Sequence, residues 1–144
     1  MRILLVTPLY PPDIAGPSAY VKELAVRLGG IHEIRILTYG HIPETVPGVS
    51  IRAVEKSLPL PIRLFNFFVA LIQETIHTDY IYIQNGPSVE LPMMLISYLL
   101  RKPFFLRLGD SVSVSHSLNT PILKKILTTT LARAHGVIVH NAED

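Results

Sequence analysis

The sequence predicts an α/β protein with a doubly wound, mostly parallel sheet of about six strands and helices on both faces. Short apolar segments, typical of buried strands, alternate with longer segments whose apolar residues recur at helical spacing. Hydrophobic residues make up 49% of the 144 residues and charged residues only 17%, which suits a sheet covered on both faces. No linker, repeat or low-complexity tract divides the chain, so residues 1–144 are expected to form one domain.

Composition and charge exclude several classes of protein. The net charge is only +2 and the basic residues are scattered, so we expect no nucleic-acid partner. The absence of Cys excludes disulfides and thiolate metal sites and fits the cytoplasm. The longest apolar stretches, 67–72 and 91–100, are shorter than the roughly 18 residues of a membrane span. The first apolar run is also too short for a signal peptide. We therefore expect a soluble or peripheral protein.

The first half of the chain predicts three strands and one helix before residue 55. Residues 3–7 form a short apolar strand that ends at Pro8, and residues 34–38 and 49–54 form the next two. Between them, residues 19–28 have helical spacing, with Ser18 as the expected N-cap and Gly29-Gly30 as the stop. Only about nine residues separate the second and third strands, whereas a parallel crossover usually takes a dozen or more. The pairing of the third strand is left open.

The second half predicts three more strands and three helices. The strongest helical stripe in the chain comprises Leu64, Phe67, Phe68, Leu71 and Ile72. Strands are expected at 80–83, 104–108 and 136–140, with Ser88 capping a helix after the first of these. Residues 109–119 are expected to form a polar loop, and Thr120-Pro121 to cap and open the last helix. The residues expected to point inward from that helix are Ile122, Leu123, Ile126, Leu127 and Leu131.

Parallel sheets of this kind bind ligands at the carboxyl ends of their strands, near the switch point. That places the candidate site in four loops, 8–18, 38–47, 84–88 and 109–120. The first loop leads into a helix, so its N–H groups and the helix N-terminus favour an anion. Gly16 would let a phosphate or a sugar approach the backbone closely, although a turn alone would also explain it.

Four polar or aromatic residues of these loops have both a functional and a structural interpretation. Asp110 follows a strand and could bind ligand hydroxyls, or it could cap a turn. His116 could touch a substrate or lie in solvent. Asn85 could contact a ligand or shape its turn, and Tyr10 could line the cleft or pack in the core.

Well-known cofactor and metal motifs are absent from the sequence. The first loop has neither G-x-G-x-x-G nor G-K-[ST], which disfavours a dinucleotide site and a P-loop. The chain also lacks H-E-x-x-H, an EF-hand pattern and a D-x-D pair. We therefore expect neither a metal nor a cofactor. A flavodoxin-like cofactor binder is disfavoured too, because the first loop is rich in proline rather than hydroxyl groups.

The order of several segments resembles that of family 4 glycosyltransferases (glycosyl transferases group 1). The segments that carry the resemblance are MRILLVTPLYPPDIAG at 1–16, YVKELAVRL at 20–28, HEIRILT at 32–38, RKPFFLRLGD at 101–110 and AHGVIVHN at 134–141. The resemblance implies one Rossmann-like half of a GT-B fold, the N-terminal domain that mainly holds the acceptor. It also implies sugar transfer from a nucleotide-sugar, a co-substrate rather than a cofactor, with retention and without a metal.

The resemblance assigns roles to individual residues. Gly16 stands at the family position whose backbone faces the donor diphosphate, where fixed N–H dipoles stabilise the departing charge. Asp110 and His116 are the catalytic candidates that it suggests after the fifth strand. The residues expected to line the donor or acceptor site are Tyr10, Gly16, Ser18, Asn85, Gly109 and Asp110. The sequence departs from the family at Ala15, where a second glycine is usual, and in having Gly109-Asp110 where many members carry a histidine.

The implied partners are a nucleotide-sugar, a sugar or lipid-linked acceptor, and a C-terminal donor-binding domain or partner subunit that these residues do not supply. Without it the chain is expected to be inactive. Lys124, Lys125 and Arg133 on the last helix fit either peripheral contact with the inner face of the membrane or a solvated helix face. The alternative to an enzyme is a non-catalytic Rossmann-like binding or scaffold subunit that partners a separate chain.

Overall fold

Six parallel strands form a single sheet in the order β3-β2-β1-β4-β5-β6 in the computed structural model, which describes residues 1–13, 16–109 and 111–139. The strands are β1 (Arg2–Thr7), β2 (Glu33–Gly40), β3 (Ser50–Glu55), β4 (Tyr80–Gln84), β5 (Phe104–Leu108) and β6 (Gly136–Val139). The helices are α1 (Gly16–Leu28), α2 (Leu60–Ile76), α3 (Pro87–Leu99), α4 (Ser111–Asn119) and α5 (Pro121–Arg133). The predicted α/β fold class is confirmed.

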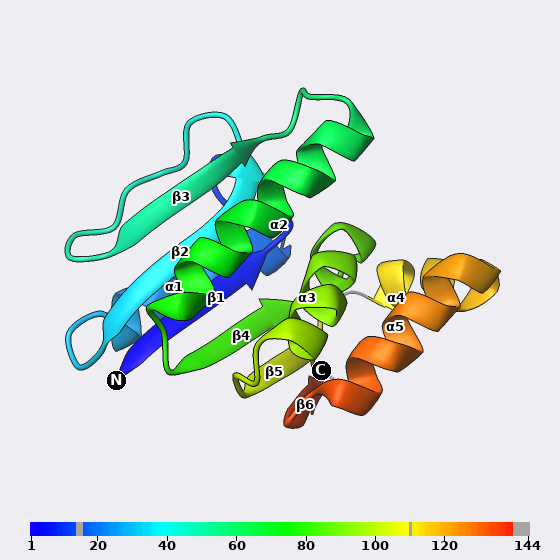
Figure 1. Ribbon diagram of the computed structural model, residues 1–144. Coiled ribbons are helices and arrows are strands. Elements are labelled where there is room, and N and C mark those ends of the chain that lie inside the picture. Colours follow the sequence, from blue (N-terminus) through cyan, green and yellow to red (C-terminus); the bar gives the residue numbers. More distant parts are fainter. Residues whose placement is uncertain (14–15, 110, 140–144) are drawn as a thin grey trace.

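Helices cover both faces of the sheet, as predicted. α2, α3 and α5 pack on one face and α1 on the other (Figure 1). Leu4 and Val6 of β1 belong to the larger core cluster, whereas Leu5 between them belongs to the cluster under α1. Successive strand residues point to opposite faces, so a strand buried on both sides must be apolar throughout. This explains the unbroken apolar run at the start of the chain.

β3 pairs parallel to β2, which answers the question that the short connection left open. The register runs from Arg35 opposite Ser50 to Gly40 opposite Glu55. Residues 41–49 return along the sheet without a helix. Nine extended residues span up to ~30 Å, enough to pass back along a six-residue strand. The N–H of Glu44 donates to the Pro11 carbonyl (3.0 Å), so this connection is hydrogen-bonded to the loop after β1.

The apolar stripe predicted for the helix before the fourth strand is confirmed in α2. Phe67 and Leu71 are fully buried, and Phe68 and Ile72 pack against the same cluster. Phe67 stacks on Tyr39 of β2, with ring centroids 4.2 Å apart and an interplanar angle of 11°. This contact fixes α2 over the carboxyl end of β2.

The predicted serine caps are wrong. α1 begins at Gly16, so Ser18 is its third residue, and its Oγ donates to the Asp13 carbonyl (2.7 Å). α3 begins at Pro87 with Gly86 as N-cap, and Ser88 instead offers its carbonyl to the Tyr39 hydroxyl (2.7 Å). Each of these two helices has a proline within its first two residues. Proline suits the first turn because it lacks an N–H and has a helical φ, and so both helices begin before the serine.

The predicted polar loop at 109–119 is also wrong over most of its length, because Ser111–Asn119 form α4. Serine is a poor helix former, but tertiary packing overrides propensity. Val114 packs against the larger core cluster and Ser117 is buried. Thr120 precedes α5 as predicted but makes no side-chain cap, since its Oγ1 donates to the His116 carbonyl (3.2 Å).

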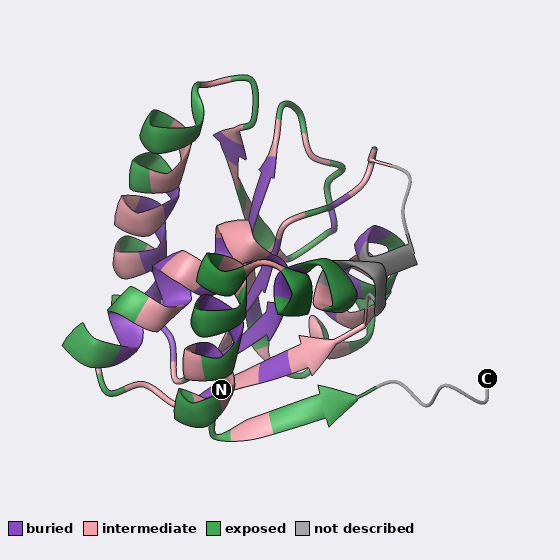
Figure 2. Ribbon diagram, turned by 90° about the vertical axis from the view of Figure 1, so that its right-hand side faces the viewer, coloured by how far each residue is buried: buried purple, intermediate pink, exposed green. Residues whose placement is uncertain are grey.

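The last helix differs from expectation at Ile122. Ile126 and Leu127 are buried as predicted, whereas Ile122 is 73% exposed and borders a groove between α3 and α5. Ile122 lies in the first turn of α5, where the helix does not reach the sheet. β6 is described as far as Val139 and is mostly exposed at the edge of the sheet (Figure 2).

Candidate functional site

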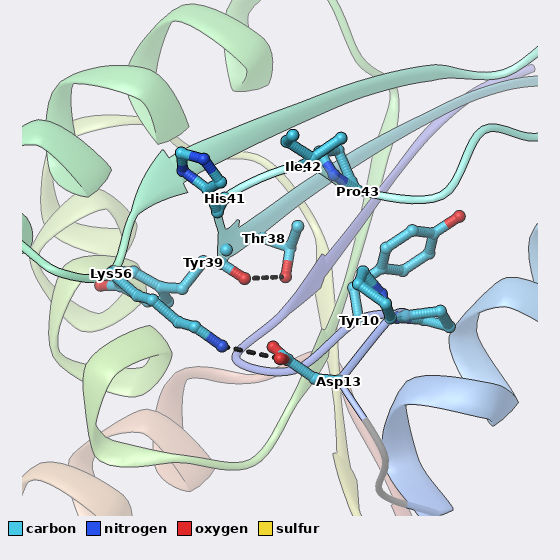
Figure 3. A pocket seen from close by; sticks show the side chains of 11 residues that line it. Tyr10, Asp13, Thr38, Tyr39, His41, Ile42, Pro43 and Lys56 are labelled. Carbon is cyan, nitrogen blue, oxygen red and sulfur yellow. Dashed lines mark hydrogen bonds and ion pairs between the residues drawn. The ribbon is translucent and has the colours of Figure 1, made fainter.

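All strands are parallel, so their carboxyl ends and the loops that follow them share one edge of the sheet. Strand order reverses direction between β1 and β4, and this switch point is where doubly wound sheets bind ligands. A pocket of about 80 Å³ opens at the carboxyl ends of β1, β2 and β3, on one side of this point, and is lined by residues 10–13, 38–43 and Lys56 (Figure 3). Two of the four loops predicted from sequence therefore line this pocket.

An ion pair crosses the pocket. Lys56 Nζ, just after β3, lies 2.7 Å from Asp13 Oδ1 in the loop after β1 (Figure 3). The Asp13 carbonyl also accepts from Ser18 Oγ in α1. The side chain of Lys56 is 48% exposed and that of Asp13 is 27% exposed, so water and ligand hydroxyls can reach them.

Tyr10 lines the pocket but is also part of the core. It is only 2% exposed, and its hydroxyl donates to the Glu44 carbonyl (3.0 Å), pointing away from the ion pair (Figure 3). Burial, with a smaller contribution from the negative charge of Glu44, raises the pKa of Tyr10. The phenol therefore stays protonated. It holds the 41–49 connection against the first loop.

A second pair lies at the rim, where His41 Nδ1 is 2.7 Å from Glu55 Oε2. Hydrogen bonds from His41 and from the backbone and hydroxyl of Ser57 lower the pKa of Glu55. Asp13, His41 and Lys56 were not singled out from the sequence. Their position directly after strands or inside the first loop was the only signal that could have found them.

The loops after β4 and β5 are joined by Asn85 and Gly109. The Gly109 N–H donates to Asn85 Oδ1 (3.0 Å), and the Asn85 N–H donates to the Arg107 carbonyl (3.0 Å). The prediction that both residues belong to the candidate site is consistent with their place at this edge. The contact also gives Asn85 a structural role, because it fixes the backbone beside Gly109.

The other predicted site residues are dispersed. Gly16 begins α1 at this edge, and Ser18 is buried against Asp13. His116 is exposed in the last turn of α4 and does not line the pocket. Asp110 lies outside the described residues. Within the described ranges no three His, Asp or Glu residues gather as metal ligands.

This arrangement suits hydrogen bonding to hydroxyl groups more than acid–base chemistry. Asp13 and Lys56 can accept from and donate to a polyhydroxylated ligand. About 80 Å³ holds a few water molecules or one polar group, so a larger ligand would have to lie along the edge. None of the helices in the described residues is long and apolar enough to cross a membrane.

Comparison with known proteins identifies the fold but no family. The sequence matches no protein-family model and no curated protein. Among solved structures, Anabaena Alr3699/HepE in complex with UDP is similar at a TM-score of 0.60 and 17% identity, over 96% of this chain and 43% of that one. The complex of HepE with UDP and glucose is similar at a TM-score of 0.60 and 16% identity, over 96% of this chain and 44% of that one. The chain thus spans less than half the length of HepE.

A further similar structure is the C-terminal domain of the coenzyme A biosynthesis bifunctional protein CoaBC. Its TM-score is 0.54 at 13% identity, over 99% of this chain and 74% of that one. At such identities the likeness shows the fold alone, a Rossmann-like α/β sheet of the kind found in a GT-B half. Because one fold serves unrelated chemistries, function depends on the site.

Proposed function

We propose that this chain is the acceptor-side half of a glycosyltransferase that transfers a sugar from a nucleotide-sugar. One observation carries the proposal: the open edge at the β1–β4 switch point, with the start of α1 and the Asp13–Lys56 pair beside it. The likeness to a UDP-bound structure over 96% of the chain supports it. The proposed partner is a second, donor-binding domain or subunit, since the pocket is too small for a whole nucleotide-sugar.

In this proposal Asp13, Lys56 and the start of α1 bind and orient the substrates rather than transfer protons. Asp13 and Lys56 hydrogen-bond acceptor hydroxyls, and the N–H groups at the start of α1 face the donor diphosphate. Such dipoles stabilise the growing charge of a leaving nucleoside diphosphate without a metal. Retention of configuration and independence of metal ions are part of the proposal. Asp110 and His116 remain its catalytic candidates.

The test is release of nucleoside diphosphate from a nucleotide-sugar by the chain combined with a donor-binding domain. Release should require an acceptor, persist with a metal chelator, and give a product whose anomeric configuration matches that of the donor. Loss of nucleoside diphosphate release in Lys56→Met would support a site at the carboxyl edge of the sheet. Lys22→Met on α1 is the control and should retain release. If the combined protein binds no nucleotide-sugar and releases no nucleoside diphosphate, the enzyme proposal fails, and a non-catalytic binding or scaffold subunit becomes the better account.

Peripheral contact with the inner face of the membrane is proposed as a further property. Two apolar grooves of about 260 and 180 Å³ flank α3, one towards α5 and one towards α2. Exposed side chains there include Phe65, Leu95, Tyr98 and Ile122, and Lys125 lines the first groove. The only carboxylate of α3, α4 and α5 is Glu90, which is buried. An apolar and basic surface of this kind suits anionic lipid.

Arg133 does not belong to that basic surface in the way the sequence suggested. Its Nε and Nη2 donate to the Oγ and the carbonyl of Ser97 (2.6 and 2.7 Å), and its guanidinium stacks over Tyr98. Co-sedimentation with phosphatidylcholine vesicles, with and without phosphatidylglycerol, tests the contact. Binding should require the anionic lipid and weaken in Lys125→Gln. If the same fraction of the protein sediments with and without vesicles, the proposed contact is contradicted.

A further inference from the structure

Arg107 occupies a distinctive place at the carboxyl end of β5. Its guanidinium carbon lies 3.7 Å from the centroid of the Tyr20 ring, which projects from α1. Stacking of this kind orients a guanidinium and leaves its charge and its donors available to a ligand. The group therefore bridges β5 and α1 at the edge where the candidate site lies.

No carboxylate neutralises Arg107 within residues 1–13, 16–109 and 111–139. Carboxylates pair with four of the other arginines, Arg2, Arg27, Arg35 and Arg52, whereas Arg63, Arg101 and Arg133 also lack such a partner among the described residues. Arg107 is only partly exposed, and withdrawing a charge from water is costly unless an opposite charge compensates it. A bound anion would supply that compensation.

The backbone beside Arg107 leaves room for the guanidinium. A Cβ at Gly109 would lie 2.7 Å from Arg107 Nη1, so any larger residue would displace that group. Asn85 in turn holds the Gly109 N–H through its side-chain oxygen. Asn85 and Gly109 therefore position Arg107 whether or not they touch a ligand themselves.

Two buried polar groups of β4 lie beneath this position. Tyr82 is 8% exposed and Gln84 2%, and Gln84 stands opposite Arg107 in the sheet. Neither the Tyr82 hydroxyl nor one end of the Gln84 amide makes a hydrogen bond of normal geometry among the described residues, although Gln84 and Arg107 lie close enough to the hydroxyl to act on its pKa. The other end of that amide lies 2.9 Å from Thr7 Oγ1. Buried polar atoms are normally paired, so these two mark an incomplete polar site.

The Tyr82 hydroxyl is available as a donor. Burial raises the pKa of Tyr82 to about 12, although nearby Gln84 and Arg107 act in the opposite direction. The phenol is therefore protonated at neutral pH. Two kinds of donor, guanidinium and phenol, thus lie together at the ends of β4 and β5.

We propose that Arg107, stacked on Tyr20 and accompanied by the Tyr82 hydroxyl, forms a binding site for a phosphate group of the ligand. Guanidinium and hydroxyl donors suit phosphate oxygens, which guanidinium groups bind in bidentate fashion. The site itself follows from these contacts, whereas the two sources of the phosphate rest on the proposed function. The phosphate belongs either to the diphosphate of the donor or to a phosphorylated acceptor.

The experiment titrates the 144-residue chain, labelled with ¹⁵N, with inorganic pyrophosphate while the Arg107 Nε–Hε resonance is followed. We expect a saturable shift of that resonance, and weaker binding at higher salt. Arg107→Met should weaken binding by about tenfold or more, because a charge-assisted hydrogen bond is lost. Arg107→Lys should be intermediate, since it keeps the charge but not the fork.

Arg101→Met is the matched control, because Arg101 is exposed, precedes β5 at the opposite edge, and has no carboxylate partner among the described residues either. It should bind pyrophosphate as the wild type does. Gly109→Ala should weaken binding too, by displacing the guanidinium, and so keeps the test valid if Arg107→Met does not fold. An unchanged affinity in Arg107→Met, or an Arg107 resonance that does not respond at saturation, would overturn the proposal.

Two further probes distinguish the sources. If Arg107→Met weakens the binding of uridine diphosphate as much as that of pyrophosphate, the site binds the diphosphate of the donor. If the substitution weakens the binding of a hexose phosphate and leaves the binding of uridine diphosphate unaffected, the site binds a phosphorylated acceptor. Failure of the proposed function is separate, because the chain would then bind phosphate through Arg107 while no combination with a donor-binding domain transfers sugar.

Discussion

Lys56 Nζ lies 2.7 Å from Asp13 Oδ1, so an ion pair joins the end of β3 to the loop after β1 across the mouth of the pocket. Both side chains remain partly exposed, at 48% and 27%. Exposed pairs contribute about 0–1 kcal/mol, because water competes for both charges. The pair therefore shapes the pocket more than it stabilises the fold.

A double-mutant cycle checks that estimate. Asp13→Asn, Lys56→Met and the double variant should give a coupling in the free energy of unfolding below about 1 kcal/mol, smaller still at high salt. Urea denaturation at two salt concentrations measures it. A coupling of several kcal/mol would mean that the pair is far less solvated than its exposure indicates.

Asn85 should be important for stability as well as for the site. Asn85→Ala removes the acceptor of the partly buried Gly109 N–H, and leaving a donor unpaired away from water costs about 1–3 kcal/mol. We expect a loss of that size in the free energy of unfolding, measured by urea denaturation. Asn66→Ala is the control, because Asn66 is exposed on α2, and its effect should stay within about 0.5 kcal/mol. Equal effects of the two substitutions would contradict the role given to Asn85.

Gly86 is the N-cap of α3 and has a φ of 157°. Residues with a side chain rarely adopt that backbone conformation. A Cβ at this position would also lie 3.1 Å from Pro8 Cγ. Gly86→Ala should therefore lower the free energy of unfolding by about 1–3 kcal/mol. Gly30→Ala, where an added Cβ meets nothing within 4 Å, is the control for thermal or urea unfolding. A neutral Gly86→Ala would show that the turn can relax.

The sequence predicted the strands well because the sheet is buried on both faces. Leu4, Leu5 and Val6 must all be apolar when successive side chains enter different clusters. The α2 stripe was equally visible, because Phe67 and Leu71 are buried in the larger core cluster. α4 was missed because its helix depends on packing by Val114 and Ser117 rather than on propensity.

The parts of the site that could not be predicted depend on contacts between distant segments. The direction of β3 follows from a connection that is hydrogen-bonded through Glu44 to Pro11. Asp13 meets Lys56, 43 residues away, and Asn85 meets Gly109, 24 residues away. No local pattern in the sequence predicts such contacts between distant residues. The loops were predictable because they follow strands, whereas the partners of individual side chains were not.

Glu90 provides the pH-dependent prediction. It lies in the first turn of α3 and is 1% exposed. Its Oε1 accepts from the Gly86 N–H (3.2 Å), while Oε2 is buried without a partner among the described residues. Burial raises the pKa of Glu90, and the Gly86 hydrogen bond only partly opposes this. The folded protein therefore holds a proton on Glu90 at pH values where the unfolded chain has lost it.

Unfolding then releases a proton, so the contribution of Glu90 to stability is greatest below its ordinary pKa of 4.5 and is lost as pH rises through the raised value. Glu90→Gln keeps an acceptor for Gly86 and removes the charge. Its unfolding free energy relative to the wild type should therefore increase with pH and level off above the folded pKa. Urea denaturation from about pH 4.5 to 8 measures this difference. Glu23→Gln on α1 is the control, because its carboxylate is largely exposed. A wild type that stays more stable than Glu90→Gln by a constant amount would show that the folded protein compensates the buried charge.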